Sequence, residues 1–382
     1  MESGDKIMIY MDNSATTMVC PESVSIMKEV MEKSYGNPSS LHSMGLESEK
    51  LLISARKLVA KSIGKQESTI YFTSGGTESD NTAIIGGAVR NSHGRKTVIT
   101  SEVEHPAVLE SMKYLKTLGF EIKYVKVDKE GVVDLGHLNS LLSDDVILVS
   151  IMHVNNETGA VMPIKEAYNL VKNFREDILF HSDMVQSYLK TDFVDVDLAS
   201  MSAHKVHGPK GVGLLYIKEG ININPLIFGG GQQKNLRPGT ENVPGICGFG
   251  EAVRVFDNQK SFEKVSEIKN SLVEKVLNNI DNVTINSGKN SLPYVLNMSF
   301  EGVKSEVLLH SLESAGIMVS SGSACSSNHP SPSHVLKAMG LKKELIDSSL
   351  RFSFSAYNTI EETDIVAEAL KKQVTILRKV MR

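Results

Sequence analysis

The chain has 382 residues, 41% of them hydrophobic, which is enough for two domains or for one large domain with a subdomain. The formal net charge is -4, from 41 Lys and Arg against 45 Asp and Glu, so the charge favours neither nucleic acid nor a membrane surface as a partner. The three cysteines, Cys20, Cys247 and Cys325, are too few and too far apart for a disulfide framework or a closed zinc site. They indicate a reducing compartment.

The N-terminus contains only a short apolar run, Ile7 to Met11, which lacks the apolar core of a secretory signal. No other segment approaches the roughly 20 apolar residues that span a bilayer. We therefore expect a cytoplasmic protein that does not enter a membrane.

Between about residues 70 and 217, short β-rich apolar runs alternate with stretches of helical period. This alternation predicts an α/β fold, with a mainly parallel sheet flanked by helices. The predicted strands are 97–100, 145–152, 177–183, 198–203 and 211–217, and the predicted helices are 78–91, 106–119 and 164–176.

A change of pattern follows a helical stretch near 245–259, where a charged amphipathic helix begins at about 261. We place a domain boundary there, with a large domain over residues 16–256 and a smaller α/β domain formed by 1–15 and 257–382. The small domain is predicted to contain strands near 283–286 and 294–300, and helices near 305–316 and 360–380.

Polar residues follow several predicted strands, at the edge where open α/β sheets bind ligands. Gly75, Gly76 and Thr77 stand at a helix start, where free N–H groups attract an anion, although a plain glycine turn with Thr77 as N-cap is an alternative. His105 precedes Pro106, so it is either a helix N-cap or a flat ring at the site.

Asp183 and Lys205 provide the opposite charges of this group. Asp183 ends an apolar strand, with Gln186 one turn later, and needs a cationic partner or strong hydrogen bonds unless it only caps a helix. Lys205 follows a buried strand and can form a Schiff base with an aldehyde, unless it is an ordinary surface lysine. An anion cradle, an acid, a flat ring and a lysine together indicate pyridoxal 5'-phosphate.

A loop over about 320–334, "SSGSACSSNHPSPSH", holds Cys325 among serine, glycine and proline. Its composition predicts a surface loop with little apolar area to anchor it. A thiol in such a loop is unusual, because free cysteine is ordinarily buried.

Ten motifs, in order from residue 10 to about 355, give the chain a close resemblance to the cysteine desulfurases whose catalytic cysteine lies in an extended loop. They are "YMDNSATT", "GNPSSLH", "FTSGGTESDN", "EVEHPAV", "NNETG", "SDMVQS", "SAHKVHGPKG", "GGGQQKNLRPGTEN", "SSGSACSS" and "LRFSFS". The resemblance implies a fold-type I pyridoxal-phosphate enzyme of the class V aminotransferase group that works as a homodimer and binds no metal.

The resemblance also implies roles for individual residues. Lys205 would form the Schiff base, His105 would stack on the cofactor ring, Asp183 would pair with the ring nitrogen and Gln186 would contact the ring oxygen. Gly76, Thr77, Ser202 and His204 would hold the phosphate, and Thr240 would reach the phosphate of the neighbouring subunit. Asn156 and Arg351 would orient the substrate, and Cys325 would carry its sulfur as a persulfide.

The implied reaction converts L-cysteine to L-alanine and passes sulfur to an acceptor, such as an iron-sulfur scaffold or a pathway for thio-cofactor or tRNA sulfur. The chain ends at "ILRKVMR", without the tail that some relatives use to dock a scaffold, so the sequence does not identify the sulfur acceptor. Alternatives are a selenocysteine lyase or aminotransferase of the same fold, and an idle sulfur-carrier or scaffold subunit. A nicotinamide enzyme is disfavoured, because "GICGFGEA" has no strand immediately before it.

Overall fold

The computed structural model describes residues 8–321 and 332–380. The helices are α1 (Pro21–Lys33), α2 (Ser43–Ser62), α3 (Gly76–Asn81), α4 (Gly87–Arg90), α5 (Pro106–Thr117), α6 (Leu135–Leu141), α7 (Ile164–Phe174), α8 (Val243–Val255), α9 (Asn258–Asn279), α10 (Ser305–Ser314), α11 (His334–Ala338), α12 (Lys343–Asp347) and α13 (Ile360–Val380). The strands are β1 (Ile9–Tyr10), β2 (Ile70–Thr73), β3 (Thr97–Ser101), β4 (Glu121–Val125), β5 (Val146–Ser150), β6 (Leu179–Asp183), β7 (Leu198–Ser202), β8 (Gly213–Ile217), β9 (Val283–Ile285), β10 (Val295–Phe300), β11 (Ile317–Met318) and β12 (Ser349–Ser353).

The largest sheet within the described ranges has the strand order β2-β8-β7-β6-β5-β3-β4. Its strands from β7 to β4 are parallel to one another, whereas β8 is antiparallel to both of its neighbours. The predicted mainly parallel sheet is therefore confirmed. The edge strand β4 was not predicted, because its partly exposed sequence lacks the continuous apolar character of the buried strands.

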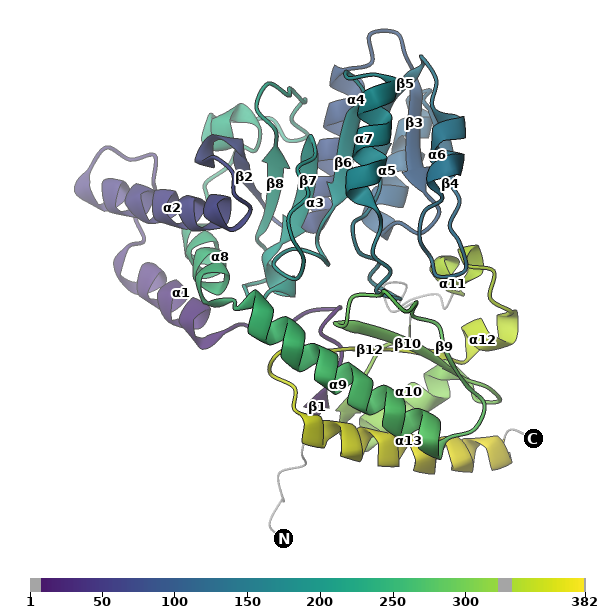
Figure 1. Cartoon of the computed structure of the whole chain (residues 1–382). Helices are drawn as coiled ribbons and strands as arrows, with labels where there is room; N and C mark the ends of the chain where they lie inside the picture. Colours follow the sequence, from purple (N-terminus) through teal and green to yellow (C-terminus); the bar gives the residue numbers. More distant parts are fainter. Residues whose placement is uncertain (1–7, 322–331, 381–382) are drawn as a thin grey trace.

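Both faces of this sheet are buried, because successive side chains of a strand point to opposite faces. In β8, Leu214 belongs to the core that includes residues of α2, α6, α7 and α8. Leu215 belongs to a second core, which includes residues of the π-helical turn Thr82–Gly86, of α4 and of α5. In β6, Phe180 lies in the same core as Leu214, and Leu179 lies in the same core as Leu215. Figure 1 shows the resulting layers, with helices in front of the sheet and behind it.

A smaller antiparallel sheet, β12-β10-β9, has a core of its own beneath α9, α10 and α13. It lies below the large sheet in Figure 1. The predicted boundary falls between the end of α8 at Val255 and the start of α9 at Asn258. However, Val335 and Leu336 of α11, which were assigned to the small domain, pack in the core of the large sheet, so the division into domains stays a prediction.

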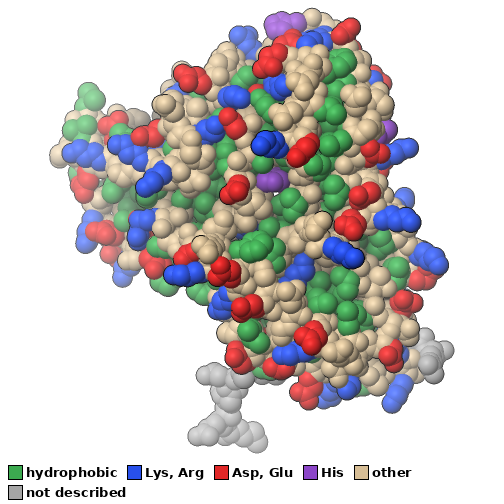
Figure 2. Space-filling view, viewed as in Figure 1, with side chains coloured by type: hydrophobic (Ala, Val, Ile, Leu, Met, Phe, Trp, Pro, Cys, Tyr) green, Lys and Arg blue, Asp and Glu red, His purple; other side chains and the backbone are tan. Residues whose placement is uncertain are grey.

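The start of the described chain pairs with segments more than 300 residues later in the sequence. Strand β1 pairs in parallel with β11, and Asp12 bridges to Ser353. In the described part of the chain, no helix is both long enough and apolar enough to cross a membrane. Charged side chains of both signs are mixed over the face drawn in Figure 2.

Candidate active site

A cavity of about 520 Å³ opens between the two sheets, a size typical of a small-molecule site. Strands β3, β5, β6 and β7 end toward it, because parallel strands bring their carboxyl ends to one edge of the sheet. It is lined by Ser14, Ala15, Gly76, Thr77, Asp80, His105, Pro106, Met152, Asn156, Glu157, Asp183, Val185, Gln186, Ser202, His204, Lys205, Pro332, Ser333, His334 and Arg351. Of the predicted site residues that the structure describes, it thus brings together all except Thr240.

Lys205 ends a short 3-10 turn, Ala203–Lys205, that directly follows β7. Its Nζ donates hydrogen bonds to the backbone oxygens of Ser14, at 2.5 Å, and Ala15, at 2.7 Å. The amine is therefore held at the cavity by a segment about 190 residues away in the sequence.

Asp183 is the last residue of β6 and is buried. Its Oδ1 accepts a hydrogen bond of 2.9 Å from the Val185 N–H, and a turn rather than a helix follows, so the helix-cap alternative is wrong. Burial raises the pKa of this carboxyl to about 6, although the Val185 N–H and the positive charge of Lys205 oppose the rise. A protonated ring nitrogen in the cavity would stabilise its ionised form.

His105 is both a helix cap and a wall of the cavity, so its two proposed roles are compatible. It precedes Pro106 as the N-cap of α5, and its Nδ1 accepts a hydrogen bond of 3.1 Å from the Ala107 N–H. Burial, followed by the positive charges of Lys205 and His334, lowers the pKa of His105 to about 4. The ring is therefore neutral near pH 7, and its proton lies on Nε2.

The anion cradle lies at the start of α3. The N-cap is Gly75, so the alternative of Thr77 as N-cap is wrong. The first N–H groups of a helix have no partners within it and are available to an anion. A Cβ added at Gly76 would lie 2.6 Å from Val185 Cγ2, so this wall of the cavity admits no side chain at that position.

Two further polar atoms at the cavity are placed to bind a ligand. Within the described residues, Ser202 Oγ and Gln186 Oε1 are buried without a hydrogen-bond partner. The Nε2 of Gln186 donates to the Ser14 backbone oxygen, which fixes the amide in place. Buried polar atoms ordinarily have partners, so both atoms fit a bound group with a hydroxyl and a phosphate, as pyridoxal 5'-phosphate has.

Arg351 reaches the cavity from β12 of the small sheet. Its Nη2 donates to Asp12 Oδ1 at 2.8 Å and its Nη1 donates to the Asn156 backbone oxygen at 3.1 Å. Its Nε is buried and, among the residues that the structure describes, has no partner. The edge formed by Nε and Nη2 is therefore suited to a substrate carboxylate.

Several lining residues were not predicted from the sequence. Asp80 lies four residues after Gly76, and burial and then the negative charge of Asp183 raise its pKa. Glu157, whose pKa burial raises to about 7, accepts a 2.6 Å hydrogen bond from the Ser333 hydroxyl. Helical spacing from the glycines could have identified Asp80, whereas nothing near Glu157 in the sequence predicts its contact with residue 333.

Asp80, His105 and Asp183 offer ligand atoms that lie within 4.8 Å of one another, close enough to hold a metal ion. Asp80 is 1% exposed, and its Oδ1 lies 3.6 Å from His181 Nε2, on the side of Asp80 that is buried in the protein. His105 and Asp183 are the predicted contacts of the cofactor ring, so the space between these two side chains fits the ring as well as a metal ion.

Thr240 lies apart from this group. Thr240 is exposed and does not line the cavity, so its role in a neighbouring subunit stays a prediction. Cys325 lies outside the described residues. Both flanks of its segment adjoin the site, because Ser320 pairs with Arg351, and Pro332 and Ser333 line the cavity.

Comparison with known proteins agrees with this geometry. The model of the class-V aminotransferase family matches residues 9–366. The chain is 44% identical to a protein named cysteine desulfurase IscS from Dictyoglomus turgidum, over 97% of this chain and 96% of the relative. It is 43% identical to one of the same name from Methanosarcina thermophila, over 97% and 93% of the two chains.

Solved structures show the same likeness. A structure titled NifS-like protein has a TM-score of 0.91 and 39% identity, covering 97% of this chain and all of its own. The structure of a NifS-like protein from Rickettsia africae has a TM-score of 0.85 and 31% identity, with the same coverage of both chains. The fold-type I architecture predicted from the sequence is thereby confirmed, and the chain belongs to the cysteine desulfurases of the class-V aminotransferase family.

Proposed function

We propose that the protein is a pyridoxal-phosphate-dependent cysteine desulfurase that converts L-cysteine to L-alanine and retains the sulfur as a persulfide on Cys325. The observation that supports this most is the convergence of Lys205, Asp183, His105 and Arg351 on one cavity. Relatives that are 44% and 43% identical over nearly the full length are named for this activity.

The residues of the cavity suit the cofactor. Lys205 would bond its aldehyde carbon, Asp183 would pair with its ring nitrogen, and the neutral ring of His105 would stack on it. The start of α3, with Ser202 and His204, would hold its phosphate. When bound, pyridoxal phosphate withdraws electrons from the α-carbon of the amino acid, which permits loss of the Cα proton.

The chain's own residues would then act in sequence. Arg351 holds the substrate carboxylate and Lys205 Nζ takes the Cα proton. The Cys325 thiolate attacks the substrate sulfur, so that an S–S bond forms as the C–S bond breaks. In balance, L-cysteine and the Cys325 thiol give L-alanine and a Cys325 persulfide.

The reach of Cys325 supports this assignment. The described residues on both sides of 322–331 adjoin the cavity, because Ser320 pairs with Arg351 and Pro332 lines the cavity wall. An extended chain spans about 3.3 Å for each residue, so a segment of this length allows the thiol both to meet the substrate and to present sulfur outside. Equal release of alanine and sulfide from L-cysteine with a reductant tests the proposal. Alanine without transferable sulfur on Cys325 would favour the selenocysteine lyase or aminotransferase alternative.

The assignment of Lys205 has a separate test. Borohydride should fix the cofactor to the peptide that contains Lys205, and Lys205→Ala should lose this attachment. Cofactor fixed to the protein in the variant would contradict the assignment.

We also propose a homodimer, formed by a surface around α1 and α2, which project beyond the edge of the large sheet (Figure 1). Tyr35 and Leu41, between α1 and α2, are 71% and 95% exposed. Phe228 is 84% exposed and lies five residues before Gln233, which accepts a hydrogen bond from Arg56 of α2. Exposed aromatic and aliphatic side chains on this scale are typical of an interface. Phe228 is also close in sequence to Thr240, the predicted contact with the partner's phosphate.

The dimer is tested by sedimentation of Phe228→Glu, with Tyr114→Glu on α5 as a matched control, since Tyr114 is 51% exposed elsewhere. A dimer that withstands Phe228→Glu and loses no activity would contradict this surface. The sulfur acceptor would be another protein, such as an iron-sulfur scaffold. We also propose a cytoplasmic location, since three widely spaced cysteines are typical of a reducing compartment.

A further inference from the structure

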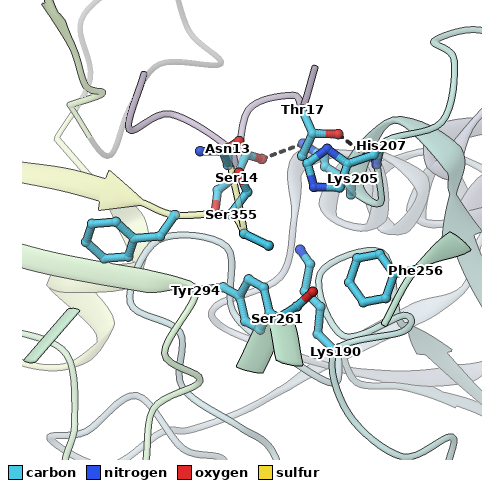
Figure 3. A pocket seen from close by; sticks show the side chains of 12 residues that line it. Asn13, Ser14, Thr17, Lys190, Lys205, His207, Phe256, Ser261, Tyr294 and Ser355 are labelled. Atoms are coloured by element: carbon cyan, nitrogen blue, oxygen red, sulfur yellow. Dashed lines mark hydrogen bonds between the residues drawn. The ribbon is translucent and has the colours of Figure 1, made fainter. Parts of the chain in front are cut away.

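A second, much smaller cavity lies beside Lys205 (Figure 3). Its volume of about 10 Å³ is close to the minimum for one water molecule. Lys205 and Ser14 line both this cavity and the candidate active site, so the two spaces share a wall. The remaining lining residues are Asn13, Thr17, Lys190, His207, Phe256, Ser261, Tyr294, Phe354, Ser355 and Ala356, with no carboxylate among them.

Lys190 places a buried amine inside this small cavity. It is only 6% exposed, and Figure 3 shows its amine directed into the middle of the cavity. Its Nζ lies 5.2 Å from the centre of the Tyr294 ring. To any other residue that the structure describes, this amine makes neither a hydrogen bond nor an ion pair.

Tyr294 adds a second unused polar group. Its hydroxyl is buried and makes no hydrogen bond of normal geometry to the described residues. Burial raises the pKa of the phenol, and the nearby Ser261 hydroxyl only partly opposes the rise. A water molecule can accept from the amine of Lys190 and exchange a hydrogen bond with this hydroxyl, which satisfies both groups.

The charges around Lys190 favour proton exchange near neutral pH. Burial, and then the positive charge of Lys205, lowers the pKa of Lys190 to about 7. The other titratable groups nearby are His204 and His207, which follow β7, and Tyr294, which precedes β10. Burial lowers the pKa of both histidines, so they are neutral at that pH and offer Lys190 no counter-charge.

We propose that Lys190 is a positioning residue that acts through Lys205, with one water molecule in this cavity passing protons between the two amines. The inference rests on the proposed function, in which Lys205 takes the Cα proton. The water accepts a proton from Lys205 Nζ as it donates another to Lys190 Nζ, and the reverse transfers return it before alanine leaves. One proton moves in each direction, and no electrons are exchanged.

An unpaired buried amine destabilises a fold, so a role in proton transfer and a purely structural role predict different results for Lys190→Met. Methionine fills a similar volume without the amine. The variant should keep or raise the Tm of the holoenzyme. It should slow the exchange of the L-alanine Cα proton in D₂O by about tenfold, since Lys205 would return the proton it has just taken.

Two readouts do not depend on turnover. The visible absorbance of the bound cofactor, titrated with pH, should move its midpoint upward in Lys190→Met, because a neighbouring positive charge is lost. A crystal structure that resolves waters should show one water in contact with Lys190 Nζ and the Tyr294 hydroxyl. Tyr294→Phe, which keeps the lysine, should shift the titration less than Lys190→Met does.

Lys269→Met is the matched control. Burial lowers the pKa of Lys269 to about 8, but its Nζ donates to the Ser291 hydroxyl at 2.8 Å and it lies away from the cavity. An unchanged midpoint and exchange rate in Lys190→Met, a lower Tm without either shift, or a cavity without water would overturn the proposal. If native protein fails to make alanine from L-cysteine, the proposed function fails instead.

Discussion

Arg351 provides the sharpest test of how the substrate is held. In Arg351→Lys the positive charge stays, but an ammonium cannot present the parallel N–H groups of Nε and Nη2. The native side chain already uses Nη2 for Asp12 and Nη1 for the Asn156 backbone, and its buried Nε remains for the carboxylate. The variant should therefore lose one charge-assisted hydrogen bond to L-cysteine.

Such a bond contributes about 1.5–3 kcal/mol, and each 1.4 kcal/mol, roughly, changes affinity tenfold. The KM for L-cysteine should rise by about ten- to a hundredfold while kcat changes little, because the bond acts alike in the ground state and the transition state.

The measurement is the initial rate of alanine release against L-cysteine concentration. Arg378→Lys is the control, since Arg378, in the last turn of α13, donates to the backbone oxygens of Asp281, Asn282 and Glu301. A KM within twofold of the native value would refute the role of Arg351. A fall in kcat alone would show that Arg351 serves the chemical step.

Three further changes test other parts of the site. Asp183→Asn should keep the cofactor absorbance but lower alanine release by about a hundredfold, because a buried charge aimed at the ring is lost; activity near the native level would contradict this. Cys325→Ser should bind L-cysteine yet release no alanine, and mass spectrometry should find added sulfur only on the native peptide. Burial raises the pKa of Glu104 to about 8 from an ordinary value of 4.5. The contribution of Glu104 to stability is therefore complete below pH 4.5, and it is lost as the pH rises from there through 8. The Tm of Glu104→Gln should therefore vary less than the native Tm between pH 5 and 9, and parallel curves would contradict the assignment.

Local patterns predicted five of the seven strands of the large sheet, because buried strands need continuous apolar runs. They missed β2 and β4. They also located Lys205 and Asp183, each at or just after the end of a strand. Motif order added the roles of Arg351 and Cys325, which no periodicity indicates. The alternative to the anion cradle, in which Thr77 caps the helix, is wrong because Gly75 takes that position.

The unpredicted features depend on contacts between distant segments. Lys190 was not singled out from the sequence, since a lysine in a turn is ordinarily exposed, and only the packing of Tyr294 and Phe256 encloses it. The contact between Glu157 and Ser333 spans 176 positions. Helical and strand periods relate residues a few positions apart, so they give no information about such pairs.

The pairing of β1 with β11 determines when the site can form during synthesis. Ser14 leaves the ribosome early, but the strand that fixes its neighbourhood, Ile317–Met318, emerges about 300 residues later. Arg351, the partner of Asp12, follows later still. The nascent large sheet therefore emerges with an unfinished pocket, and the enzyme can assemble its complete site only once nearly the entire chain has been made.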